Sequence, residues 1–77
     1  MPTFNYTVDD EPQSTTSHKL TATQILTNAE IDPANHYLVQ IEGNHRTSYQ
    51  GNPQQEIPMH EKMVFISVST GPTPVSH

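Results

Sequence analysis

The segment TATQILTNAEIDPANHYLVQI, residues 21–41, decides the fold because it contains a capped helix, a turn and a strand in that order. Thr21 and Gln24 have the spacing of a capping box: the Thr21 hydroxyl can accept a hydrogen bond from the first helical turn, and the Gln24 side chain can accept one from the backbone of Thr21. Pro33 disfavours helical geometry at the residue before it, so we expect the helix to end near Glu30. A helix this short needs a sheet under its apolar face.

The last part of this segment has the two-residue period of a strand. Tyr37, Val39 and Ile41 alternate with Leu38 and Gln40. Because successive side chains of a strand point to opposite faces, the first three residues are expected on one face of a sheet and the other two on the opposite face.

Further strands are predicted on both sides of the segment. Alternation predicts a half-buried strand over residues 4–8, and a Ser/Thr-rich stretch over residues 14–20 suits a polar edge strand paired with it as a hairpin. Residues 9–12 and 42–44 have turn chemistry, and residues 45–49 can return as a short strand. Residues 50–59 are expected to form an irregular loop that places Ile57 and Met59 on the core. Residues 63–69 are the most apolar strand, apolar on both faces in its first half, as in a central strand.

The predicted fold class is α+β, with the order β-β-α-β-β-β in a mixed sheet and one helix across it. If the last strand lies beside the first, the two run parallel in the centre and the polar strands form the edges. That arrangement is a β-grasp. The predicted domain covers residues 1–71, and residues 72–77 are expected to be a flexible tail.

Composition argues against several classes of function. The net charge is −5, and three cations among 77 residues cannot form a stripe along a nucleic acid backbone. There is no cysteine, and the five histidines match no zinc spacing, so no metal or cofactor is expected. No glycine-flanked nucleophile or phosphate loop points to an enzyme. No apolar run is long enough to span a membrane and no signal pattern begins the chain, so a cytoplasmic protein is expected.

At residues 21–26 (TATQIL), 29–41 (AEIDPANHYLVQI) and 62–66 (KMVFI), the chain resembles bacterial ubiquitin-like domains of the multiubiquitin type. The resemblance covers nearly the whole chain. It implies a ubiquitin-like β-grasp protein modifier that a peptidase trims at its C-terminus, an E1-like enzyme activates and an E2-like enzyme helps to join to a target protein. An antiphage operon is one genetic setting that the resemblance suggests.

The resemblance also implies where conjugation takes place. Gly71 would supply the terminal carboxylate after cleavage before Pro72, and Thr70 stands where ubiquitin has the first glycine of a pair. A glycine suits this role because it has no side chain to obstruct a narrow channel. Lys19 and Lys62 are the side-chain amines on which chains of modifiers could be built, although solubility alone is the favoured interpretation of both.

A partner-binding surface is predicted at Phe65, Gln40 and Leu38. Alignment with ubiquitin puts Gln40 at the position of the isoleucine on its recognition surface. If Val64, Ile66 and Val68 face the helix, Phe65 faces out and can anchor an activating enzyme. The alternative for Phe65 is ordinary packing within the sheet.

Two other functions use the same predicted fold. A non-covalent adaptor would retain its activity after deletion of residues 72–77, or of Gly71 as well. A sulfur carrier with a terminal thiocarboxylate needs an exposed glycine pair, and this sequence has Val75-Ser76-His77 at that place, so it ranks last.

Overall fold

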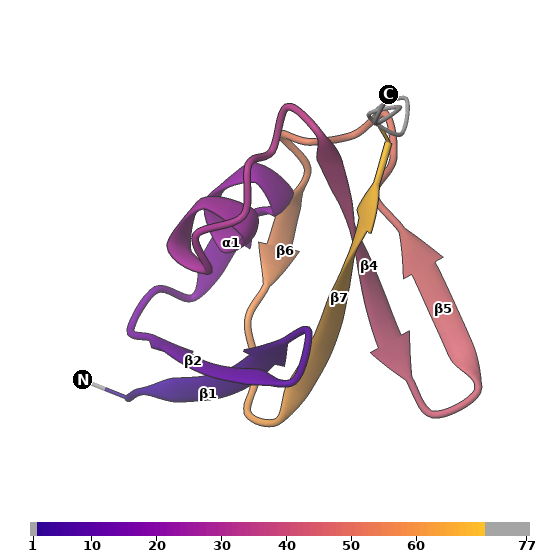
Figure 1. The fold of residues 1–77 in the computed structure, drawn as a ribbon. Coiled ribbons are helices and arrows are strands. Elements are labelled where there is room, and N and C mark those ends of the chain that lie inside the picture. Colours follow the sequence, from indigo (N-terminus) through magenta and orange to yellow (C-terminus); the bar gives the residue numbers. More distant parts are fainter. Residues whose placement is uncertain (1, 71–77) are drawn as a thin grey trace.

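The computed structural model describes residues 2–70, which form a mixed five-stranded sheet, a two-stranded sheet and one helix (Figure 1). The five-stranded sheet has the order β2-β1-β7-β4-β5, in which β1 and β7 run parallel and the other neighbours are antiparallel. The α+β class and the central place of the last strand beside the first are therefore confirmed. The elements are β1 (Phe4–Val8), β2 (Glu11–Thr15), β3 (Lys19–Thr21), α1 (Ala22–Asn28), β4 (His36–Glu42), β5 (His45–Ser48), β6 (Glu56–Pro58) and β7 (Met63–Ser69).

The start of α1 has the predicted capping box. The backbone N–H of Gln24 donates to the Thr21 hydroxyl at 3.1 Å, and the backbone N–H of Thr21 donates to Gln24 Oε1 at 2.9 Å. These two bonds satisfy donors that the first turn of a helix otherwise leaves free. The predicted helix is confirmed.

The end of α1 is a Schellman motif. The backbone N–H of Ile31 donates to the carbonyl of Leu26 at 2.9 Å, and that of Glu30 donates to the carbonyl of Thr27 at 3.0 Å. Glu30 takes the left-handed conformation, with φ of 63°, that this motif requires at its turning residue. The chain then reaches Pro33, which cannot continue a helix.

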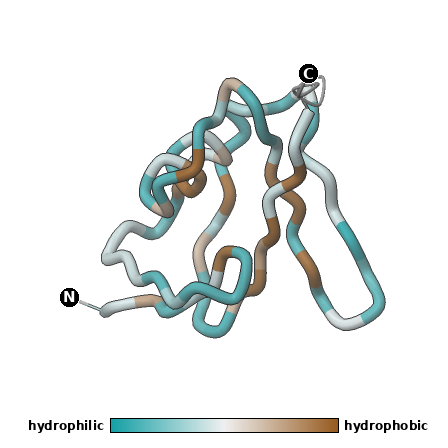
Figure 2. Tube along the Cα trace, in the orientation of Figure 1, coloured by the Kyte–Doolittle hydropathy of each residue, from teal (hydrophilic) through white to brown (hydrophobic). Residues whose placement is uncertain are grey.

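The hydrophobic core lies between α1 and the inner face of the sheet. Figure 1 shows α1 and β6 together on one side of the sheet, and Figure 2 shows hydrophobic segments in α1 and the central strands. The rings of Tyr6 and Phe65 meet edge to face at the centre, with centroids 5.9 Å apart. The buried core residues are Tyr6, Val8, Leu20, Ala22, Ile25, Leu26, Leu38, Ile57, Met59, Met63 and Phe65.

The predicted second strand, residues 14–20, is wrong in its bounds. Asp9 and Asp10 have φ of 52° and 68°, which is the backbone of a two-residue primed turn, so the chain reverses earlier and β2 begins at Glu11. Pro12 lies inside β2, opposite Thr7 in the register, and β2 is an edge strand, where a missing N–H is tolerated.

The second half of the predicted strand belongs to another sheet. β3 pairs with β6, a strand inside the stretch that was predicted to be an irregular loop. Three residues are too few for a sequence pattern to identify as a strand. The predicted contribution of that loop to the core is confirmed, since Ile57 and Met59 are buried.

Within residues 2–70, no helix has both the length and the hydropathy needed to cross a membrane.

Candidate functional site

Phe65 lies in the core, so the prediction that it faces outward is wrong. Its side chain is 0% exposed, whereas Val64, beside it on β7, is 39% exposed. The parallel register explains this orientation: Tyr6 pairs with Met63 and Val8 with Phe65, which puts all four side chains on the inner face. The largest side chain of β7 thus fills the centre of the core.

Leu38 and Gln40 also face the core, so the other two predicted surface residues are wrong. Leu38 is 0% exposed and Gln40 is 9% exposed. Gln40 lies opposite Phe65 in the register, and its Oε1 accepts a hydrogen bond from the Tyr49 hydroxyl at 3.3 Å. Burial, and secondarily the Glu42 carboxylate, raise the pKa of Tyr49, so this hydroxyl stays protonated and able to donate.

The outer face of the sheet carries six apolar side chains, which we call the outer apolar stripe. The register of β4 with β7 places them in three opposed pairs on that face, and Val64 is the most exposed of them. The pairs are Tyr37 with Val68, Val39 with Ile66 and Ile41 with Val64.

The sequence already contained the signal for half of this stripe. Tyr37, Val39 and Ile41 alternate with Leu38 and Gln40 in the sequence. The alternation was predicted correctly, but Leu38 and Gln40 were assigned to the outer surface, whereas they face the core and the other three face outward. On β7 the pattern was ambiguous because consecutive apolar residues permit either orientation.

Polar residues border the outer apolar stripe along one row of the sheet. The register places Thr7 beside Val64 and Arg46 beside Ile41. In this row Val64 and Ile41 can make apolar contacts with a partner protein. The guanidinium of Arg46 at the rim can add one charge-assisted hydrogen bond.

β7 ends at Ser69, and Thr70 is held at the top of the sheet. The backbone N–H of Thr70 donates to the carbonyl of Asn35 at 2.8 Å, and the Thr70 side chain is exposed. Gly71 and Pro72, the predicted conjugation and cleavage residues, lie outside the described residues. The last described residue is therefore anchored directly before them.

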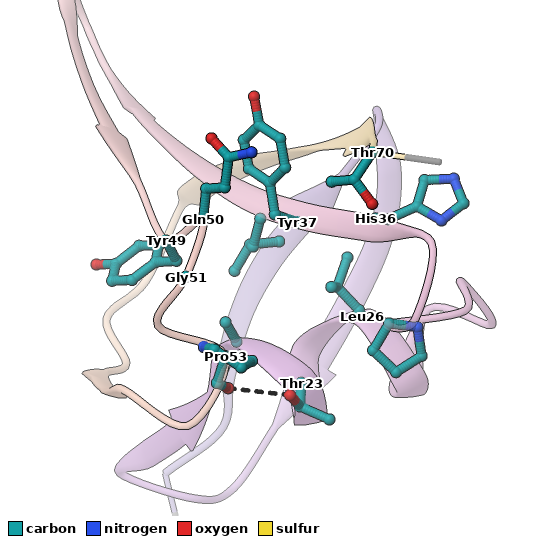
Figure 3. Close-up of a pocket in the computed structure, with 12 residues that line it drawn as sticks. Thr23, Leu26, His36, Tyr37, Tyr49, Gln50, Gly51, Pro53 and Thr70 are labelled. Atoms are coloured by element: carbon teal, nitrogen blue, oxygen red, sulfur yellow. Dashed lines mark hydrogen bonds between the residues drawn. The ribbon is translucent and has the colours of Figure 1, made fainter. Parts of the chain in front are cut away.

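A cavity of about 210 Å³ opens beside Thr70. Figure 3 shows that residues from four segments surround it: Leu26 from α1, His36 from the start of β4, Pro53 from the loop between β5 and β6, and Thr70. The Thr23 hydroxyl donates to the carbonyl of Pro53 at 3.0 Å, which ties α1 to that loop and fixes one wall of the cavity.

The two lysines predicted as sites for chain building are both exposed. Lys19 lies on β3 with its Nζ 3.9 Å from a carboxylate oxygen of Glu56. Lys62 precedes β7 with φ of 67°, and its backbone N–H donates to the carbonyl of Asn5 at 2.7 Å. Both amines are accessible from solvent.

Among residues 2–70, no three His, Asp or Glu side chains gather as a metal site would require. No protein-family model, no curated protein and no solved structure matches this chain.

Proposed function

We propose that this chain is a bacterial ubiquitin-like β-grasp modifier, trimmed after Gly71, activated by an E1-like enzyme and conjugated to target proteins with an E2-like enzyme. The observation that carries the proposal is the position of β7. This last strand lies between β1 and β4, and it brings the chain to Thr70 at one end of the sheet, one residue before Gly71 in the sequence. A rigid body that presents a glycine at its exit is what enzymes acting on that glycine need.

The outer apolar stripe supports the same proposal. Val64 and its neighbours lie on β7, which runs toward Thr70, and on the antiparallel β4, which begins beside Ser69. An enzyme could therefore bind the outer apolar stripe while it acts on the residues after Thr70. Apolar surface of this kind, bordered by polar residues, is typical of protein-binding sites. In this proposal the chain is a substrate of other enzymes, in the bacterial cytoplasm, and is not itself an enzyme.

Co-expression with an E1-like enzyme, an E2-like enzyme and a peptidase from the same gene neighbourhood tests the proposal. Intact mass spectrometry should show loss of residues 72–77, and denaturing gels should show adducts of higher mass. Gly71→Val should abolish the adducts because its side chain obstructs the channel to the activating site. Thr73→Ala, a change in the segment that is removed, should leave them unchanged. An unchanged intact mass without adducts would refute the proposal.

The outer apolar stripe also favours a second candidate, a non-covalent adaptor, since it can bind a partner without any reaction at Gly71. The two candidates differ in their response to one pair of variants. Val64→Asp should abolish partner binding in both cases, because it places a charge among apolar contacts. A stop codon in place of Gly71 should abolish the function of a modifier and leave that of an adaptor intact.

A further inference from the structure

We infer that the open edge of β5 (His45–Ser48) is a docking site for an extended acidic segment of a partner protein, which adds to the five-stranded sheet as a sixth strand. The sheet has two edges, β2 and β5, which lie on opposite sides of it (Figure 1). Within residues 2–70, β5 pairs with β4 alone. A strand that adds to an edge is held by backbone hydrogen bonds, so the edge must offer free N–H and C=O groups.

The edge of β2 lacks one of these donors. The backbone N–H of Asn5 on β1 donates to the Glu61 carboxylate, so it points away from β2. In an antiparallel pair, opposed residues that bond each other alternate with opposed residues that do not. Asn5 is opposite Ser14, so Ser14 and Pro12, two residues earlier, turn their backbone toward the open side. Pro12 has no N–H to offer there.

The edge of β5 keeps its donors. The backbone N–H of Tyr49 donates to the carbonyl of Leu38 on β4 at 2.9 Å, so these two residues bond each other across the ladder. Thr47, two residues before Tyr49, belongs to the next bonded pair. Arg46 and Ser48 alternate with them and turn their N–H and C=O groups toward the open side, and both residues are exposed. The β5 edge can therefore pair with a further strand, whereas the β2 edge is interrupted.

The charge at the β5 edge favours an acidic partner. Arg46 is one of three cations in a chain of net charge −5, and the only one on the described strands of the five-stranded sheet. Its guanidinium forms no ion pair within residues 2–70. Glu42 lies opposite His45 in the register and, by alternation, on the other face of the sheet from Arg46. A carboxylate across from Arg46 on the added strand therefore gains a charge-assisted hydrogen bond without a competing acid.

Ser48 sets the second position of the partner segment. It lies opposite Val39 on the outer face, two residues from Arg46. Because serine is small, a long apolar side chain opposite Ser48 on the added strand can extend over it toward the outer apolar stripe. The expected segment therefore has an apolar residue and an acidic residue two positions apart, on one face.

A second copy of this chain is a poorer occupant of the edge. Two four-residue strands paired edge to edge bury far less than the roughly 1,200–2,000 Å² of a stable interface. Both copies would also carry a net charge of −5. The inference does not rest on the modifier proposal, because it involves neither Gly71 nor any reaction there.

A cyclic β-hairpin peptide is the probe, because a pre-formed strand has little entropy to lose on binding. One of its strands is Thr-Val-Thr-Glu-Thr, with the N–H groups of valine and glutamate facing outward, and the other is Thr-Lys-Thr-Lys-Thr. In ¹H–¹⁵N spectra of the full chain, the amides of Arg46 and Ser48 should shift on titration. At saturation they should exchange with deuterium at least about tenfold more slowly. The amide of Ser14, on the β2 edge, should do neither.

N-methylation of the hairpin tests whether the backbone carries the binding. Methyl groups on the valine and glutamate nitrogens should abolish the shifts, because they remove the donors that face β5. Methyl groups on the outward-facing nitrogens of the lysine strand should leave the shifts unchanged.

A charge swap tests the role of Arg46. Arg46→Glu should weaken binding at least about fivefold, and a hairpin with lysine in place of glutamate should bind this variant better than the original hairpin does. Lys62→Glu makes the same change of charge away from β5 and should leave the affinity unchanged.

Several results would overturn the inference. They include no shift at Arg46 and Ser48, equal binding of the two N-methylated hairpins, and equal affinity of the Arg46→Glu and Lys62→Glu variants. The same shifts on concentrating the chain alone would assign the edge to a second copy. Binding seen only in a chain that ends at Thr70 would assign the edge to residues 71–77.

Discussion

Glu30 occupies a backbone position that favours glycine. It turns the chain at the end of α1 with φ of 63°, and its side chain is exposed. A left-handed conformation costs a residue with a Cβ about 1–2 kcal/mol, and glycine recovers only part of this because it is more flexible in the unfolded chain. We expect Glu30→Gly to raise the free energy of unfolding by about 0.5–1 kcal/mol in urea denaturation.

A control on the same helix distinguishes this effect from a general effect of glycine. Thr27 is an exposed residue inside α1, with helical backbone. Thr27→Gly should therefore lower the free energy of unfolding by a few tenths of a kcal/mol, up to about 1. If both variants lose stability, Glu30 does not turn the chain as described.

The core contains one unfavourable feature, the buried hydroxyl of Tyr6. Its hydroxyl is buried, and no group of residues 2–70 reaches it with hydrogen-bond geometry. Burial raises the pKa of Tyr6, and the nearby Asn28 side chain lowers it by less. Because an unpaired buried hydroxyl is unfavourable, Tyr6→Phe should leave the free energy of unfolding unchanged or raise it by up to about 1 kcal/mol.

Tyr49→Phe is the matched control, since it removes the same atom from a hydroxyl that has a partner. Loss of the hydrogen bond to Gln40 leaves a buried amide oxygen without a donor, which should cost about 1–2 kcal/mol. Equal stability changes in the two variants, measured by urea unfolding, would mean that Tyr6 has a hydrogen-bond partner in solution.

At the scale of elements, sequence patterns predicted those strands and the helix whose signals are local. Thr21 and Gln24 are three residues apart, so the helix start could be predicted from the chain alone. A turn within residues 9–12 could also be predicted, but its exact position could not, because Asp9 is held by residues far along the chain. Its backbone N–H donates to the carbonyl of Phe65 at 3.0 Å, and its carboxylate accepts from the backbone N–H of Ser67 at 2.8 Å.

The junction of β1 and β7 should respond to acid through Glu61. The side chain of Asn5 donates to Glu61 Oε2 at 2.9 Å, and its backbone N–H donates to the same carboxylate. These two bonds, the side-chain one first, lower the pKa of Glu61 below its usual value. A group with a lowered pKa in the folded state stabilises the fold above its unfolded pKa of about 4.3, and that contribution is lost as the pH falls through the folded value.

We therefore expect the stability difference between the unmodified chain and Glu61→Gln to shrink as the pH is lowered from about 6 to about 3. Urea unfolding across this range measures it. In the background of Asn5→Ala the pH dependence of that difference should be weaker, because the larger of the two causes is gone. A difference that stays constant with pH in the unmodified background would contradict the assignment of this bond.

At the scale of the whole molecule, apolar content predicted which strands are central but could not decide which way β7 faces. Residues 63–66 are all apolar, so the sequence does not show which alternate residues of that strand face the core and which face outward. The orientation of β7 depends on its pairing with β1, because the side chains of Tyr6 and Val8 are buried in the core and their partners on β7 lie on the same face. For the candidate site, the exit at Thr70 could be predicted from strand order, whereas the outer apolar stripe required the register.

Two neighbouring residues on β7 test this orientation and the fold together. Phe65 is fully buried and Val64 is the exposed member of the outer apolar stripe. Phe65→Ala should lower the free energy of unfolding by about 3–5 kcal/mol, since it removes a ring from the centre of the core. Val64→Ala should lower it by less than about 1 kcal/mol, through weaker strand propensity and the loss of a half-exposed contact.

The small core makes the milder variant of Phe65 necessary. A chain of 77 residues has only a few kcal/mol of net stability to lose, so Phe65→Ala can unfold it completely. Phe65→Leu keeps most of the volume and should cost less than the alanine variant, yet more than Val64→Ala. If Val64→Ala proved the more destabilising of the two, β7 would have the opposite face toward α1. The outer apolar stripe would then be part of the core, and it could not serve as the proposed binding surface for partner enzymes.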